Sequence, residues 1–169
     1  MIAKTYIEST LKELDKLYNS SFSQKKTIYF SKLAIIELSG WIEETIDDII
    51  IRHANRNLKE SKNKKHCKEK IIRPNYGFQY DKNIRPMLIN LLGLIDVEKL
   101  EKKLEKKFQL ELFKQNLKNI IEIRNRAAHT YLKGVTRTFD SPSIMINSFN
   151  NIIPVLENID KELRDKKYK

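Results

Sequence analysis

The chain has 169 residues, of which 40% are hydrophobic and 33% are charged, which is the size and composition of one ordinary globular domain. Its single cysteine, Cys67, excludes an internal disulfide framework and a zinc site made of several cysteines. The formal net charge of +11 indicates an acidic partner, and nucleic acid is the commonest partner of this kind.

The N-terminal residues contain no apolar run of signal-peptide length. No segment approaches the roughly 20 apolar residues that a helix needs to span a bilayer. Together with the single cysteine, these features favour a reducing compartment. We therefore expect a cytoplasmic protein with no membrane partner.

Apolar residues at helical spacing predict two helices in the first third of the chain, from about 4 to 17 and from about 23 to 58. The second contains no proline, and Ser23 is a plausible cap. At about 1.5 Å per residue it would be roughly 50 Å long. We expect it either to kink near Gly40 or to project beyond the bundle, and we expect Gly40 and Trp41 to mark close packing with another helix.

A basic segment follows this long helix. From Lys59 to Arg73 only Glu60 and Glu69 oppose seven cations, and no helical apolar stripe appears before Ile71. The pattern predicts an exposed basic loop, at about 59–82, that would attract a phosphate backbone through counterion release. The alternative is a solvated surface without a partner.

The second half of the chain is also predicted to be helical. A short helix should begin near Pro86 and end at Gly93, and a longer apolar pattern over 97–131 should break around Gln109. The Ser141-Pro142 pair predicts the start of a last helix that contains Pro154 and is kinked or split there. The sum is an all-α, antiparallel helical bundle, a single domain over 1–169.

Arg124 and His129 lie near the end of one predicted helix and suit chemistry on RNA. Histidine exchanges protons near neutrality, and arginine holds a phosphate with two hydrogen bonds. Asn125 shares a face with His129, whereas Arg124 continues the apolar line of Leu117 and Ile121, where a charge needs a partner or an anion. The pair fits attack of a ribose 2′-hydroxyl on the adjacent phosphorus, in which His129 moves the proton and Arg124 stabilises the phosphoryl charge.

Other interpretations of these residues remain open. His129 could simply interact with the dipole at the helix C-terminus, and Arg126 is either a solvated or an RNA-facing charge. Ala127 and Ala128 are small enough to let another helix approach, and a two-fold dimer would then bring two motifs together. The chain has no Glu-x-x-His pair and no phosphate-binding Gly-rich loop, so we expect neither a metal nor a cofactor.

The residues Arg124, Asn125 and His129 resemble the motif of the HEPN (higher eukaryotes and prokaryotes nucleotide-binding) domain family, in which Arg and a polar residue precede His. Tyr131 extends the resemblance to Arg-x4-His-x-Tyr, the motif of HEPN toxins that are paired with minimal nucleotidyltransferases. The resemblance implies a helical bundle that dimerises with both motifs at the interface. It also implies that a nucleotidyltransferase-like antitoxin modifies Tyr131 by AMP transfer.

Our first hypothesis is a metal-independent endoribonuclease, a toxin or antiviral defence effector, that acts as a homodimer with a composite site at the dimer interface. It would leave 2′,3′-cyclic phosphate ends on RNA. Arg124, His129 and Asn125 would be catalytic, and the residues expected to contact RNA are Arg126, Lys62, Lys64, Lys65, Lys68, Lys70 and Lys133. The alternative is a catalytically inert HEPN module that binds RNA or a partner protein.

Overall fold

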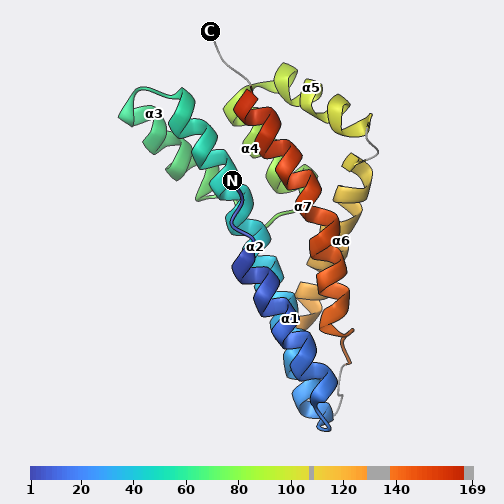
Figure 1. Ribbon diagram of the computed structural model, residues 1–169. Helices are drawn as coiled ribbons and strands as arrows, with labels where there is room; N and C mark the ends of the chain where they lie inside the picture. The colour runs from blue at the N-terminus through green and yellow to red at the C-terminus, as the bar shows by residue number, and fades with distance from the viewer. Residues whose placement is uncertain (107–108, 129–137, 166–169) are drawn as a thin grey trace.

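The computed structural model describes residues 1–106, 109–128 and 138–165, and this part of the chain contains helices and no strand (Figure 1). The prediction of an all-α protein is therefore confirmed. None of the helices in these ranges is long and apolar enough to cross a membrane. In chain order, with η marking π-helical segments, the elements are α1 Thr5–Ser20, α2 Gln24–Asn57, α3 Ser61–His66, η1 Cys67–Ile72, η2 Tyr80–Ile84, α4 Arg85–Leu92, α5 Leu94–Glu105, α6 Gln109–Ala128 and α7 Pro142–Asp165.

The predicted long helix is confirmed as α2, which runs unbroken through Gly40. A short connection joins it to α1, and the two helices pack side by side (Figure 1). The indole of Trp41 fixes this arrangement, since its Nε1 donates a hydrogen bond to the Ala3 carbonyl at 2.8 Å. Its ring meets Phe149 of α7 edge to face, with the centroids 5.2 Å apart.

One hydrophobic core joins these helices, and α2 contacts α1, α6 and α7. The residues that α6 buries are spaced by three, four or seven positions, as an amphipathic helix requires: Leu110, Phe113, Leu117, Ile120 and Ala127. Pro154 lies inside α7 without dividing it, so of the two predicted outcomes, a kink or a split, the split is wrong. Its exposed ring lies on the solvent side of the helix, away from the core.

The prediction of a basic loop at about 59–82 is wrong, because α3, η1 and η2 make much of this segment helical. Cys67 and Ile72 are both buried, and they anchor η1 against the core. They are five residues apart, which is the hydrogen-bond spacing of a π-helix, and Arg73 N accordingly donates to the Lys68 carbonyl at 2.9 Å. Buried residues five positions apart do not fit the α-helical period of about 3.6 residues, so the apolar pattern of the sequence did not predict this segment as helical.

A buried tyrosine connects η2, α4, α5 and α6. The Tyr80 hydroxyl donates a hydrogen bond to Glu101 Oε1 at 3.0 Å, and Arg85 Nε donates to the same oxygen at 2.8 Å. The Lys114 ammonium lies 5.2 Å from the centre of the Tyr80 ring. Burial, and then the Glu101 carboxylate, raise the pKa of Tyr80 far above its usual value, so the hydroxyl stays protonated and remains a donor.

We expect Tyr80→Phe to lower the free energy of unfolding by about 1–2 kcal/mol, because it removes a buried hydrogen bond to a charged acceptor while Arg85 still pairs with Glu101. Urea denaturation at neutral pH measures this loss. The matched control is Tyr6→Phe, since Tyr6 is 80% exposed and should tolerate the change. Equal stabilities of the two variants would contradict a structural role for the Tyr80 hydroxyl.

Candidate RNA-processing site

Arg124 occupies the position in α6 that an apolar residue would otherwise take. It lies seven residues after the buried Leu117, on the same side of the helix, and it is half-buried, as the spacing of the apolar residues predicted. Within the described residues its guanidinium forms no ion pair. Because burial of a charge without a counter-charge is costly, the site favours an anionic ligand such as phosphate.

His129, Tyr131 and Lys133 lie outside the described residues. The catalytic pairing of His129 with Arg124, the modification of Tyr131 and the RNA contact of Lys133 therefore stay predictions. Of the two alanines before His129, Ala127 is buried in the core of its own chain and Ala128 is exposed. Only Ala128 is therefore available to a second helix.

Asn125 and Arg126 are exposed and line a groove of about 680 Å³ between α6 and α7, here named the α6–α7 groove. Both helices contribute polar and apolar side chains to it. Its full lining is Asn116, Asn119, Ile120, Glu122, Ile123, Asn125, Arg126, Ile144 and Ser148. The sequence did not indicate this groove, because it forms only where α7 packs against α6. Asn125 lines it, whereas Arg124 does not.

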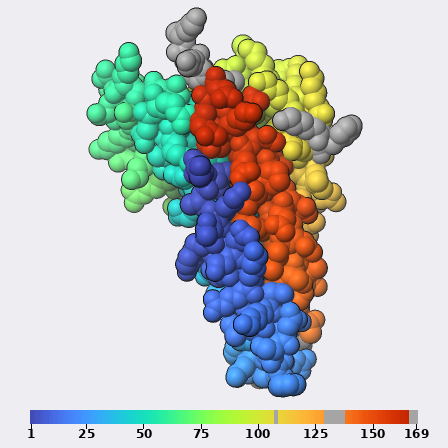
Figure 2. Space-filling model, in the orientation of Figure 1, coloured from blue at the N-terminus to red at the C-terminus, as the bar shows by residue number. Residues whose placement is uncertain are grey.

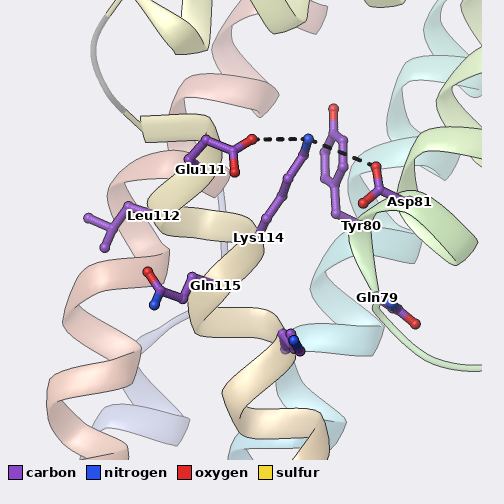
Figure 3. A pocket seen from close by; sticks show the side chains of 8 residues that line it. Gln79, Tyr80, Asp81, Glu111, Leu112, Lys114 and Gln115 are labelled. Atoms are coloured by element: carbon purple, nitrogen blue, oxygen red, sulfur yellow. Dashed lines mark ion pairs between the residues drawn. The ribbon is translucent and has the colours of Figure 1, made fainter.

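A second groove, of about 530 Å³, lies further back along α6, where η2 packs beside it (Figure 3). Here Lys114 points between two carboxylates, 3.2 Å from Glu111 and 3.9 Å from Asp81. We name it the η2–α6 groove, and it is lined by Gln79, Tyr80, Asp81, Glu111, Leu112, Lys114, Gln115 and Lys118.

The predicted RNA-binding lysines of the basic segment do not gather around Arg124. Lys62, Lys65, Lys68 and Lys70 are exposed and Lys64 is half-buried. All of them belong to α3 and η1, which lie at the C-terminal end of α2, at the upper left of Figures 1 and 2. The C-terminal end of α6 lies beside the N-terminal half of α2 instead (Figure 1).

The N-terminal half of α2 has an exposed apolar face on the side of the helix opposite its buried residues. Tyr29, Leu33 and Ile36 are 54%, 45% and 43% exposed, and at 100° per residue they share one side of the helix with Gly40. We name this set the α2 face. A Cβ atom placed on Gly40 would meet nothing within 4 Å, so the prediction that Gly40 packs closely against another helix of the chain is wrong. Its missing side chain leaves open space on the surface.

Charges of opposite sign stand at the two ends of the α2 face. Lys25 and Lys26 flank its N-terminal end, while Glu44 and Asp47 flank its C-terminal end, and none of the four forms an ion pair within the described part of the chain. Burial, and then the neighbouring carboxylates of Glu43 and Glu44, raise the pKa of Asp47 from 3.8 to about 6. Unlike Asp47, Glu43 has a fixed partner, since its Oε1 accepts a hydrogen bond from Gly77 N at 2.7 Å.

We expect Asp47→Asn to change how stability depends on pH. Because folding raises the pKa of Asp47, the folded wild type binds this proton more tightly than the unfolded chain, and its stability falls as the pH rises through about 6. Asparagine does not ionise. Urea denaturation, at a protein concentration low enough to keep both proteins monomeric, should therefore show nearly equal stability at about pH 4 and a more stable variant at about pH 8. Parallel pH profiles for the two proteins would refute this expectation.

No family model matches the chain, and neither a curated protein nor a solved structure matches it. The described residues also contain no group of three or more His, Cys, Asp or Glu side chains that is arranged to hold a metal ion. A function must therefore be argued from Arg124, from the grooves along α6 and from the surface charge.

Proposed function

We propose that this protein is a metal-independent endoribonuclease that acts as a homodimer. The observation that supports this most is the half-buried guanidinium of Arg124 at the end of α6, which forms no ion pair within the described residues and lies beside the exposed Asn125. An RNA phosphate supplies the anion that this position favours. His129 would then take the proton of the 2′-hydroxyl as its oxygen bonds to the phosphorus, while Arg124 stabilises the charge that develops on the phosphoryl oxygens. The bond from phosphorus to the 5′-oxygen breaks, and the departing 5′-oxygen takes up a proton from water.

The α2 face supports the dimer. A glycine inside an exposed helix costs about 1 kcal/mol relative to alanine, and nothing in the described part of the chain lies within 4 Å of a Cβ atom placed on Gly40. In an antiparallel pairing of two α2 helices about Ile36, Leu33 of one copy lies beside Gly40 of the other, and Lys26 lies beside Asp47. The same patch then complements itself in shape and in charge, as a two-fold interface requires.

Control by an antitoxin belongs to this proposal as a separate step. A nucleotidyltransferase-like partner that adds AMP to Tyr131 would place a bulky anion two residues after His129. The negative phosphate would compete with the RNA phosphate for Arg124.

One observation favours the alternative of an inert RNA-binding module. The exposed lysines of α3 and η1 lie at the other end of α2 from the C-terminal end of α6, which carries Arg124. This basic surface could bind RNA without any contribution from Arg124. Such a module would bind RNA with a strong salt dependence and leave it intact.

The two functions are separated by incubating the purified protein with total RNA in excess EDTA. The ribonuclease proposal predicts fragments that end in 2′,3′-cyclic phosphate, because the attacking oxygen belongs to the substrate and no metal is needed. Mass spectrometry of the fragments identifies these ends. RNA that stays intact while it is retained by the protein in a mobility shift would refute catalysis and favour the module.

A further inference from the structure

The two grooves lie on neighbouring sides of α6. Asn125 and Arg126 line the α6–α7 groove. Lys114, Gln115 and Lys118 line the η2–α6 groove (Figure 3). At about 1.5 Å and 100° per residue, Lys118 and Arg126 are roughly 12 Å apart along the helix axis and about 80° apart around it. A strand with about 3.4 Å per stacked nucleotide covers the axial separation in roughly four nucleotides. An RNA strand bound beside Arg126 therefore reaches the second groove if it also passes around α6.

The polar groups of the η2–α6 groove fall into two sets. Lys114 pairs with both Asp81 and Glu111 and offsets one of their two negative charges, and Lys118 offsets the other, so the groove carries no net negative charge. In contrast, the side chains of Gln79, Gln115 and Lys118 form no hydrogen bond or ion pair within the described residues, and they are available to a ligand. The volume, about 530 Å³, lies in the range typical of ligand sites, about 300–1,000 Å³.

The available groups match the parts of one nucleotide. A side-chain amide offers a donor and an acceptor next to each other, which is how it hydrogen-bonds to the edge of a nucleobase. Leu112 is 51% exposed and gives the groove an apolar surface for the face of the base. Lys118, exposed and unpaired within the described chain, is a point charge suited to phosphate.

We propose that the η2–α6 groove binds an unpaired nucleotide of an RNA strand that continues from the Arg124 end of α6. Lys118 contacts the phosphate, and Gln79 and Gln115 hydrogen-bond to the edge of the base. The direction of the strand rests on the proposed ribonuclease function. Binding in the groove, however, does not require cleavage.

The test measures binding of a single-stranded 2′-O-methyl RNA dodecamer, whose blocked 2′-oxygen prevents cleavage, by fluorescence anisotropy across a salt series. Lys118→Ala should weaken binding about 5–10-fold and lower the slope of log K against log salt by about 0.7, the value for one lost phosphate contact on a single strand. The matched control is Lys16→Ala, which removes the same charge from an exposed, unpaired position on α1. This control should leave the slope unchanged.

Gln115→Ala tests the contact to the base. Loss of one hydrogen bond, worth about 1 kcal/mol, should weaken binding about fivefold. The salt slope should stay at the wild-type value, because no charge is lost. A changed slope in Gln115→Ala would contradict its assignment to the base edge.

Two results would overturn the proposal. The first is that Lys118→Ala and Lys16→Ala bind the dodecamer with the same affinity and the same salt slope. The second is that the wild type binds AMP as tightly as the dodecamer, which would indicate a site for free nucleotides. Circular dichroism of each variant confirms that it is folded. If the wild type does not cleave RNA but Lys118→Ala still lowers the salt slope, the ribonuclease proposal is wrong and the groove proposal stands. If the wild type cleaves RNA and Lys118→Ala changes neither affinity nor slope, only the groove proposal is wrong.

Discussion

Replacing Arg124 with alanine is expected to lower the rate of RNA cleavage by about 10²–10³-fold, the usual cost of removing one preorganised group that stabilises charge in the transition state. His129→Ala should cost about 10²–10⁴-fold, because it removes the base that takes the 2′-hydroxyl proton. Since the two groups act on one step, the double variant should be only slightly slower than the slower single variant. Initial rates on a fluorogenic RNA in EDTA measure all three.

Two further variants separate a chemical role from a structural one. Arg124→Lys keeps the charge but loses the two-pronged geometry, so it should recover only part of the rate. Arg126→Ala removes a cation two residues away that is exposed to solvent, and it should mainly raise KM with little loss of kcat. If Arg126→Ala were as slow as Arg124→Ala, loss of positive charge would explain both results, and the catalytic assignment of Arg124 would fail.

The helices were predictable where the apolar period is long and uninterrupted. A stretch from about 23 to 58 without proline predicted α2, whose observed ends, Gln24–Asn57, lie within a residue of the predicted ends. The start at Pro142 was predictable for a different reason, because Ser141 and Pro142 are a local signal for the start of a helix. The position of Arg124 on the same side of α6 as the buried Leu117 also follows from the helical period alone.

The remaining features depend on tertiary contacts, which the sequence pattern does not reveal. The segment from α3 to η2 was predicted as a loop because its apolar residues are few and follow a π-helical spacing. Gly40 was assigned to close packing, yet among the described residues nothing lies within 4 Å of a Cβ atom placed on it. The η2–α6 groove requires Gln79 and Lys118, 39 positions apart, to meet, and only the folded chain brings them together.

Reversing the charge at one end of the α2 face is expected to convert a dimer into monomers. The double variant Lys25→Glu, Lys26→Glu sets four carboxylates against each other at each end of an antiparallel α2 pair, and like charges in an interface cost several kcal/mol. The complementary double variant, Glu44→Lys and Asp47→Lys, should have the same effect. Light scattering after gel filtration measures the mass, and wild type should remain dimeric at micromolar concentration.

Mixing the two charge-reversed proteins provides the decisive control, because only opposite reversals restore attraction in an antiparallel pair. The mixture should recover the dimer mass and, if the site needs both copies, the cleavage activity that each variant lacks alone. Gly40→Leu should be monomeric in every combination, since the leucine fills the space that Leu33 of the second copy would occupy. Monomeric wild type, or a mixture that stays monomeric, would show that the α2 face does not pair with itself in this way. A parallel arrangement would instead bring like charges together in wild type, so it predicts that each double variant keeps the wild-type mass.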